Sequence, residues 1–418
     1  MTVLPLASAP LHENLYTEDS TGRSINIFKL KDVQLGRHSS FYPRVEAYSH
    51  NTKSWYNPIC EKTMSLPESH NSPIHSPSLA PRASKESTPL FFFIYNTDNY
   101  YHFVYDSLPY LISFKHLRKT LPELKLLMSH PTPDRNSFYK FNLEFLELVG
   151  IKKEDIILVN PECIYSTVFV SDSYTHNDKS NSPPRVEIYK LYQDLTAACF
   201  SPLNAPLLTS KIYISRRNSS YRDKSNAGTD YTQRRKLENE DEVVERLQRR
   251  GFHEVFCENL STLEKIHLFH NASHVVGAMG GGLCNVLFSK PSTRLLALVS
   301  PIFLEVNERF KYSFSNVNVE YFTACSHTES SQIKTNMRVQ STETHALGEI
   351  SQLSPDGVCV KVAVNPVAGW SASGSYLQDF WKHGTYVTLD KGLNSPWKVD
   401  INSLEVYLDK RYNSRNDS

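Results

Sequence analysis

The sequence has no excess of charge of either sign. Its 45 basic and 44 acidic residues leave a formal net charge of +1 over 418 residues. Proteins that bind nucleic acid or anionic membranes usually do so through a basic excess, often gathered in runs. The balance therefore argues against nucleic acid and against membrane surfaces as partners of this chain.

Long apolar runs and paired cysteines are also missing. No window reaches the roughly 18 apolar residues that a membrane-spanning helix needs, and the opening MTVLPLASAPLHENLYTED lacks the basic and apolar stretches of a signal peptide. The seven cysteines show no Cys-x-x-Cys spacing, which argues against a disulfide framework or a cysteine zinc site. We therefore expect a cytoplasmic protein with no integral membrane segment.

Glycine is scarce, yet three glycines stand in a row. Only 15 residues are glycine, and Gly280, Gly281 and Gly282 lie between two apolar runs in HVVGAMGGGLCNVLF. At the carboxyl end of a parallel strand, glycines let a ligand approach the main chain, and the next helix presents N–H groups that suit phosphate. The spacing Gly280-x-Gly282-x-x-Asn285 resembles a dinucleotide fingerprint with Asn in its last position. Tight packing without any ligand is the alternative explanation.

Apolar runs of strand length alternate with helical patterns from residue 89 onward. One series extends from PLFFFIY (89–95) to RVEIYKLYQDLTAACF (185–200), and a second starts at KIYISRR (211–217). Such alternation predicts parallel sheets flanked by helices, and the break near residue 205 predicts two of them. We expect an α/β protein of two Rossmann-like domains that face a cleft.

Arginines gather near the same expected sheet edge. Arg216 and Arg217 end the strand YISRR, and Arg234 and Arg235 precede the helical NEDEVVERLQRR, for which Asn239 is a candidate N-cap. The planar arginine fork suits bidentate binding of phosphate. Because the carboxyl ends of parallel strands share one edge, these cations and the glycines can converge there. Solvated surface charge is the alternative for each pair.

The run from YISRR to LLALVSP (213–301) resembles glycosyltransferase family 61. The family's elements are a strand ending in Ser-Arg, an Arg shortly before Asn-Glu, a Gly-Phe pair, a capped helix, and a Gly-rich turn that leads into Asn and Leu-Phe. In this sequence they are Ser215–Arg216, Arg235–Asn239–Glu240, Gly251–Phe252, Ser261–Ala272 and Gly280–Asn285–Phe288. Many members have His-Gly-Ala-Gly where this chain has Met279 and the three glycines, so the role of that His does not transfer.

Upstream, NYYHFVYDSLPYL (99–111) resembles the family's N-terminal block, with His102 and Asp106 four residues apart. Inverting transfer needs a base for the acceptor hydroxyl and positive charge for the leaving diphosphate. Asp106 is the first candidate for the base, with His102 one turn away, and the two roles can be reversed. Backbone-capping roles for both side chains are the alternative.

The resemblance implies a GT-B architecture and inverting transfer from a nucleotide sugar, with a UDP-sugar expected, to a glycan or polysaccharide acceptor. The sequence has no Asp-x-Asp flanked by apolar strand residues, so we expect the transfer to be metal-independent. No cofactor and no metal are expected. The implied donor-binding residues are Ser215, Arg216, Arg217, Arg234, Arg235, Asn239, Glu240, Gly280, Gly281, Gly282, Asn285 and Glu305. For Asn239, Glu240 and Asn285, helix capping is an alternative role.

The expected domains follow from the pattern together with this resemblance. They are an irregular N-terminal region with a Ser/Pro-rich loop (1–88), an acceptor domain (89–205), a nucleotide-sugar domain (206–330), and a C-terminal extension (331–418). The last helix, from about Ile401, is expected to pack back on the N-terminal domain, with a hinge near residue 205.

Two other functions remain open. An NAD-dependent oxidoreductase would need an acidic residue about 20 positions after the glycines to bind a ribose, and the strand RLLALVS ends there in Val-Ser. A catalytically inactive family member that binds a nucleotide sugar or glycan is the second alternative, because Met279 replaces the family's frequent His. The sequence does not identify the donor sugar, the acceptor or the linkage.

Overall fold

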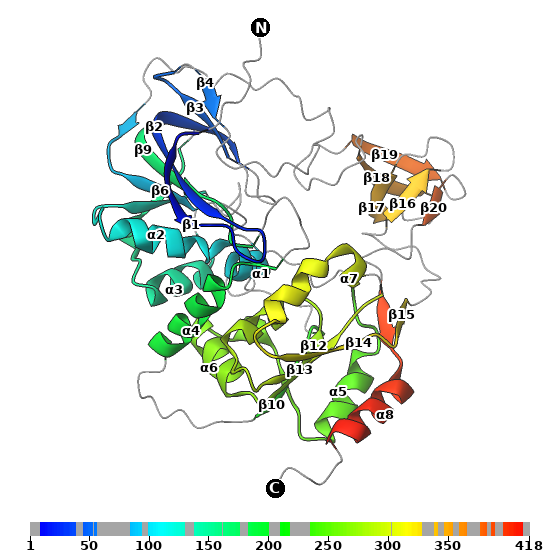
Figure 1. The fold of residues 1–418 in the computed structure, drawn as a ribbon. Coiled ribbons are helices and arrows are strands. Elements are labelled where there is room, and N and C mark those ends of the chain that lie inside the picture. Colours follow the sequence, from blue (N-terminus) through cyan, green and yellow to red (C-terminus); the bar gives the residue numbers. More distant parts are fainter. Residues whose placement is uncertain are drawn as a thin grey trace.

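The computed structural model describes most of the chain. The described residues are 9–38, 45–52, 54–56, 84–93, 99–129, 138–160, 162–175, 183–199, 210–217, 235–301, 303–327, 338–341, 347–353, 359–365, 377–382, 386–388 and 396–412. In this part of the chain the protein is mixed α/β with two main sheets, one of them entirely parallel (Figure 1).

The first sheet is mixed. Its order is β4-β3-β2-β9-β6-β7-β8, with β1 beside β2 and β5 beside β9. Strands β9, β6, β7 and β8 are parallel, whereas β2 pairs with β9 antiparallel. The strands are β1 (Leu11–Tyr16), β2 (Ile25–His38), β3 (Val45–Ser49), β4 (Ser54–Tyr56), β5 (Lys85–Glu86), β6 (Leu90–Phe93), β7 (Lys125–Met128), β8 (Ile156–Leu158) and β9 (Ile164–Ser171).

Helices cover the parallel part of this sheet, so β6 is buried along its whole length. The helices are α1 (Tyr100–His102), η2 (Phe103–Ser107), α2 (Tyr110–Arg118), α3 (Lys140–Leu148), η3 (Lys153–Asp155) and α4 (Glu187–Cys199). The prediction of an irregular region over 1–88 is wrong for its described part, because β1 to β5 join this sheet. Most of the Ser/Pro-rich loop lies outside the described residues, as does the expected hinge near 205.

The second sheet is all parallel, with the order β11-β10-β12-β13-β14. Counted along the chain this is 2-1-3-4-5, a doubly wound order of the flavodoxin type. The prediction of alternating strands and helices is confirmed here. The elements are β10 (Lys211–Ile214), α5 (Glu240–Gln248), β11 (His253–Val255), η4 (Cys257–Asn259), α6 (Thr262–Asn271), β12 (His274–Ala278), η5 (Gly281–Phe288), β13 (Arg294–Leu298), α7 (Phe303–Val306), η6 (Glu308–Phe314) and β14 (Asn318–Phe322).

Alternate residues of these strands point into two different cores, as a period of two requires. Ile212 and Val275 join Phe269 of α6 in the core on one face. Tyr213 and Val276 join Val243 of α5 in the core on the other face. Helix α6 begins with the predicted capping box, in which Ser261 and Glu264 bond to each other's backbone N–H groups.

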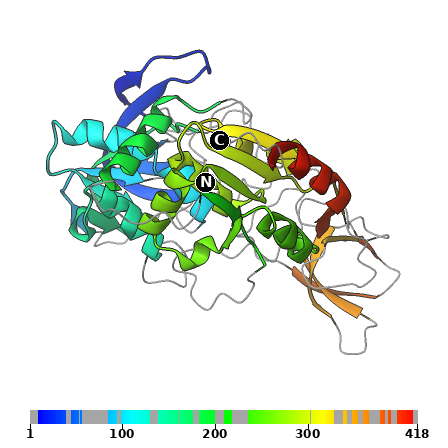
Figure 2. The ribbon, with the colours of Figure 1, turned by 90° about the horizontal axis from the view of Figure 1, so that it is seen from below.

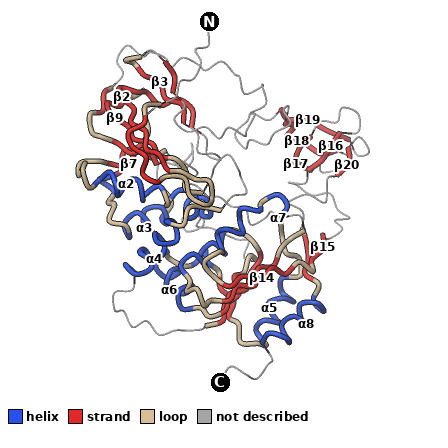
Figure 3. Tube along the Cα trace, viewed as in Figure 1, coloured by secondary structure: helices blue, strands red, loops and turns tan. Residues whose placement is uncertain are grey.

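The last helix, α8 (Ile401–Tyr412), packs on this second sheet. Its Leu404 and Leu408 are fully buried in the same core as Tyr213, beside α5 (Figures 1 and 3). The expectation that this helix returns to the N-terminal domain is therefore wrong. Its apolar side chains are covered by the face of the sheet that also supports α5.

An antiparallel sheet interrupts the C-terminal region. Strands β15 (Cys325–His327) and β21 (Trp397–Val399) pair with each other, and the sheet β19-β18-β17-β16-β20 lies between them in the chain. Figures 1 and 2 show it apart from the two main sheets. Its strands are β16 (Arg338–Ser341), β17 (Leu347–Leu353), β18 (Cys359–Asn365), β19 (Leu377–Lys382) and β20 (Tyr386–Thr388). This sheet was not predicted from the sequence.

Helix η5 joins the cores of the two main sheets. Leu283 and Val286 belong to the core of the parallel sheet, whereas Cys284, Leu287 and Phe288 belong to the core of the mixed sheet. Such a segment is apolar all round because both of its faces are buried. The run LCNVLF therefore connects the two halves of the protein.

Candidate active site

The N-terminal block NYYHFVYDSLPYL forms a short α-helical turn that widens into a π-helix. Asn99 caps it, its side chain accepting a hydrogen bond from the His102 N–H at 3.2 Å. Residues Phe103–Ser107 then form η2 as a π-helix, a feature that is frequent at functional sites. The segment lies beside η5, which contains the predicted donor residues Gly281, Gly282 and Asn285.

A network of three side chains surrounds the Asp106 carboxylate. Oδ2 lies 2.7 Å from Nδ1 of His102, and Oδ1 accepts a hydrogen bond from the Thr175 hydroxyl at 2.7 Å. Oδ1 also forms an ion pair with the Arg309 guanidinium. The Asp106 side chain is 0% exposed and that of His102 is 25% exposed. Of the two candidate bases, His102 is the one that a substrate can reach.

Arg309 and Thr175 are not among the site residues predicted from the sequence. Arg309 belongs to η6, and its guanidinium carbon lies 5.8 Å from the centre of the Tyr105 ring. Thr175 is 3% exposed and follows β9. Neither residue falls in a motif, and each reaches Asp106 across more than 60 residues of chain. No signal in the sequence pairs them with the N-terminal block.

The glycine turn links β12 to η5. Gly280 has extended backbone angles (φ 171°, ψ −177°), and a 3-10 helix, where a short helix was predicted, starts at Gly281. The first hydrogen bond of the turn joins the Leu283 N–H to the Gly280 carbonyl at 3.1 Å. The N–H groups of Gly281 and Gly282 precede that bond, as the first donors of a helix do.

The close approach of neighbouring atoms explains why glycine is needed in this turn better than unusual backbone angles do. A Cβ on Gly282 would lie 3.1 Å from Cγ2 of Ile214, and one on Gly280 would lie 3.4 Å from the Arg216 guanidinium. A Cβ on Gly281 would make only ordinary contact with Tyr101, at 3.7 Å. Packing thus accounts for Gly282, whereas Gly280 faces a cation.

Glu240 holds the end of β10. Its Oε1 accepts hydrogen bonds from the Tyr213 hydroxyl at 2.9 Å, the Ser215 hydroxyl at 3.2 Å and the Arg216 N–H at 2.8 Å. Glu240 is 4% exposed, and burial, followed by this carboxylate, raises the pKa of Tyr213 well above its usual value. The contacts direct the Arg216 side chain toward the glycine turn, where Nη1 lies 3.5 Å from the Met279 carbonyl.

The other predicted cations have different partners or are not described. Arg217 forms ion pairs with Glu254 and Asp241 at the surface, and these carboxylates, Glu254 first, raise its pKa. The Arg235 guanidinium stacks 4.6 Å from the Phe303 ring centre. Arg234 lies outside the described residues.

Asn239 stands at the N-cap position of α5 but does not cap it. Its side chain bonds to both backbone groups of Val399 instead, at 2.9 and 3.0 Å. The expectation of a side-chain cap is therefore wrong, because β21 competes for the amide. Glu305 lies in α7, and only its backbone is described.

Direct contacts bring the two halves of the site together. The Tyr100 hydroxyl donates to Oδ1 of Asn285 at 2.6 Å, and Nδ2 of Asn285 donates to the Gly282 carbonyl at 2.9 Å. Tyr101 stacks on Phe310 of η6, with ring centres 3.9 Å apart. The structure thus gathers the N-terminal block, Arg216 and the glycine turn at the edge where β10 and β12 end. In a sheet of this order that edge is the switch point where ligands bind.

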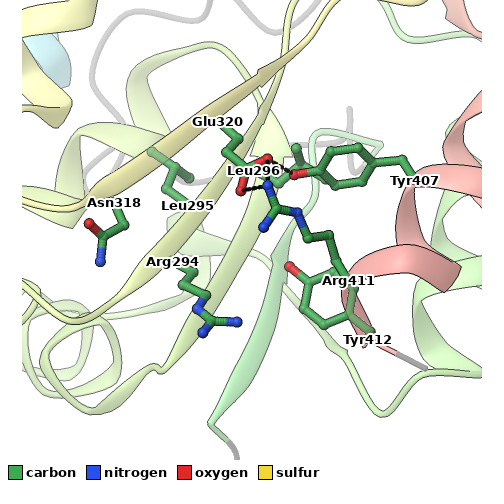
Figure 4. Close-up of a pocket in the computed structure, with 8 residues that line it drawn as sticks. All are labelled: Arg294, Leu295, Leu296, Asn318, Glu320, Tyr407, Arg411 and Tyr412. Atoms are coloured by element: carbon green, nitrogen blue, oxygen red, sulfur yellow. Dashed lines mark hydrogen bonds and ion pairs between the residues drawn. The ribbon is translucent and has the colours of Figure 1, made fainter. Parts of the chain in front are cut away.

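A separate pocket lies at the opposite edge of the parallel sheet. It has a volume of about 230 Å³ and is lined by residues that include Arg294, Asn318 and Tyr412. Figure 4 shows the Glu320 carboxylate between Tyr407 and Arg411 of α8, to which it is hydrogen-bonded. Arg294 and Asn318 begin β13 and β14, so this pocket is remote from the glycine turn.

The comparisons with known proteins identify one family. Residues 100–296 match the family model described as Glycosyltransferase 61. No curated protein matches the sequence. The matched residues include the N-terminal block and the glycine turn, but they end before Arg309. Among the described residues, no helix is long and apolar enough to cross a membrane, and no cluster of three or more His, Cys, Asp or Glu side chains suits a metal ion.

Proposed function

We propose that this enzyme moves a sugar from a nucleoside diphosphate sugar to a hydroxyl group. Residues 100–296 form a glycosyltransferase family 61 domain, and membership of that family implies sugar transfer. The expected donor is a UDP-sugar, and the expected acceptor is a glycan or polysaccharide. We propose a GT-B arrangement, in which the parallel sheet binds the donor and the mixed sheet contributes to the acceptor site.

The observation that carries the proposal is the position of the His102–Asp106 pair beside the glycine turn. An ionised Asp106 accepts from Nδ1–H of His102, which leaves Nε2 as the basic nitrogen of the neutral imidazole. In the proposed mechanism Nε2 takes the acceptor proton as the acceptor oxygen attacks the anomeric carbon. Attack opposite the leaving group inverts that carbon. Asp106 orients the ring and stabilises the imidazolium that forms, as carboxylates do in other histidine-base sites.

Positive charge for the leaving diphosphate would come from Arg216 and from backbone N–H groups. The Arg216 guanidinium lies next to Gly280, and the N–H groups of Gly281 and Gly282 open the following helix. Preorganised donors of this kind stabilise developing anionic charge most effectively in a water-poor site. Together they supply the charge that a metal ion would otherwise contribute, which supports a metal-independent mechanism.

Thermal unfolding with added nucleotides tests the proposal. We expect UDP, more than GDP, CMP or NAD, to raise the melting temperature of the wild-type protein by a few degrees. The rise should vanish in Arg216→Ala and persist in the matched control Arg217→Ala, whose side chain pairs with Glu254 and Asp241. Stabilisation by NAD alone would instead favour an oxidoreductase. Binding of UDP without turnover of any UDP-sugar would indicate an inactive member of the family.

A further inference from the structure

We propose that Arg309 sets the protonation state of the His102–Asp106 pair by neutralising the Asp106 carboxylate, and so acts as a positioning residue for the base. The inference rests on the proposed function, in which His102 takes the acceptor proton. Arg309 lies beyond the matched residues 100–296. It comes from η6, on the side of the parallel sheet, and forms an ion pair with a carboxylate on the side of the mixed sheet.

The burial of Asp106 makes a compensating charge necessary. The Asp106 side chain is 0% exposed and that of Arg309 is 17% exposed, so water screens their interaction poorly. A buried carboxylate beside an imidazole, with no other partner of opposite charge, favours the protonated imidazole. A protonated His102 cannot take the proton of the acceptor hydroxyl group. With Arg309 in place, the carboxylate is already neutralised and the imidazole can remain uncharged.

Several other groups that interact with Asp106 are neutral. Tyr101 and Tyr105 from its own segment, and Tyr192 from α4, each interact with the carboxylate, and burial raises their pKa values above the usual range. Cys284 from η5 also interacts with it and has its pKa raised by burial. Thr175 contributes a neutral hydroxyl. Arg309 differs from these neutral neighbours because it brings a positive charge to the carboxylate.

NMR titration of the His102 imidazole tests the inference without requiring any substrate. The His102 signal is identified by its loss in His102→Gln, and its titration midpoint is measured in wild type, Arg309→Gln and Arg309→Lys. We expect the midpoint to rise by about one pH unit or more in Arg309→Gln and to stay near the wild-type value in Arg309→Lys. The matched control is Arg118→Gln, whose guanidinium pairs with Asp155 2.9 Å away and should leave the midpoint unchanged.

A second pair of variants covers the case in which Arg309→Gln fails to fold. In Asp106→Asn the Arg309 charge faces the imidazole uncompensated, so the His102 midpoint should lie lower than in the double variant Asp106→Asn/Arg309→Gln. Equal midpoints in this pair, or in wild type and a folded Arg309→Gln, would overturn the proposal. If no nucleotide binds, the proposed function fails, but these titrations still decide the role of Arg309.

The kinetic counterpart is a shift of the acidic limb of the pH profile. Once a donor is identified, kcat/KM for release of the nucleoside diphosphate is measured as a function of pH. In Arg309→Gln the acidic limb of this profile should shift to higher pH, and its half-maximal pH should rise by the same amount as the NMR midpoint. A purely structural role would lower the rate at all pH values alike. An unshifted profile would contradict the proposal.

Discussion

Two carboxylates at the site, those of Asp106 and Glu240, have different tasks. The groups that surround each carboxylate determine its task. Asp106 is fully buried and is held by His102, Thr175 and Arg309. Glu240 is also buried, but its Oε1 accepts from three groups at the end of β10. The first arrangement orients an ionisable ring, whereas the second fixes the direction of a strand end. Neither task can be read from a residue's position in the family motif alone.

Replacing His102 should abolish proton transfer while leaving donor binding intact. For His102→Gln we expect the rate of acceptor-dependent diphosphate release to fall by about 10²- to 10⁴-fold, which is the usual contribution of a positioned general base. The thermal shift produced by UDP should stay within about a degree of the wild-type shift, because the donor site that we propose consists of Arg216 and the glycine turn and does not include His102.

The matched control is His116→Gln, since His116 pairs with Glu13 at the surface and should leave the rate unchanged. A His102→Gln rate within threefold of wild type would mean that another group removes the proton.

At the scale of elements, η5 determines how closely the two sheets approach. Its apolar side chains enter both cores, and the glycines before it let β10 and β12 lie close to the helix. Gly277, on β12, is the tightest of these positions, because a Cβ there would lie 3.0 Å from Cδ2 of Leu283 and 3.2 Å from the Ile214 carbonyl. Gly277 is not among the predicted site residues, which include only the three consecutive glycines.

Gly277→Ala should destabilise the protein more than Gly281→Ala does. The added methyl group of Gly277→Ala meets a backbone carbonyl that cannot move cheaply, so we expect a loss of about 1–3 kcal/mol in the free energy of unfolding, as in other overpacked cores. Gly281→Ala places its methyl group 3.7 Å from Tyr101, an ordinary contact.

Urea unfolding of both variants measures the difference. Equal stabilities would show that β12 and η5 can separate, and would argue against close packing as the reason for a glycine at 277.

At the scale of the whole molecule, tyrosines are buried in the cores of both halves. Tyr100, Tyr105 and Tyr192 lie in the core of the mixed sheet, and Tyr213 lies in the core of the parallel sheet. Burial raises the pKa of each well above the usual value near 10. These rings stay protonated in the folded protein at pH values where the unfolded chain has lost those protons.

The protein should therefore lose stability steeply in alkali. A raised folded-state pKa contributes stability that is fully present below the unfolded pKa, near 10, and is lost as pH rises above it. We expect the melting temperature to be nearly constant from pH 7 to about 9 and to fall from about pH 10 upward. Absorbance at 295 nm should show these tyrosines ionising together with unfolding. Their ionisation at pH 10 in a protein that remains folded would contradict this account.

The linear pattern was sufficient for several local elements of the parallel sheet and for the family. Short apolar runs predicted β10, β12 and β13, the Ser261–Glu264 spacing predicted the capping box, and the motifs between Asn99 and Phe288 predicted the glycosyltransferase 61 domain. These features depend on residues close together in the chain, or on motifs that survive as short blocks. The sequence also placed Arg216 and the glycines at one sheet edge, because the carboxyl ends of parallel strands share one edge.

Contacts between segments that are distant in the sequence could be identified only from the tertiary structure. Only the fold brings Arg309 and Thr175 to Asp106, directs Arg217 to surface carboxylates while Arg216 faces Gly280, and ties Asn239 to Val399 rather than to its own helix. It also decided that β1 to β5 extend the first sheet and that α8 covers the second. The physical reason is the same in each case. A side chain's partner is selected by burial and charge in three dimensions, and those are fixed only after the sheets have packed.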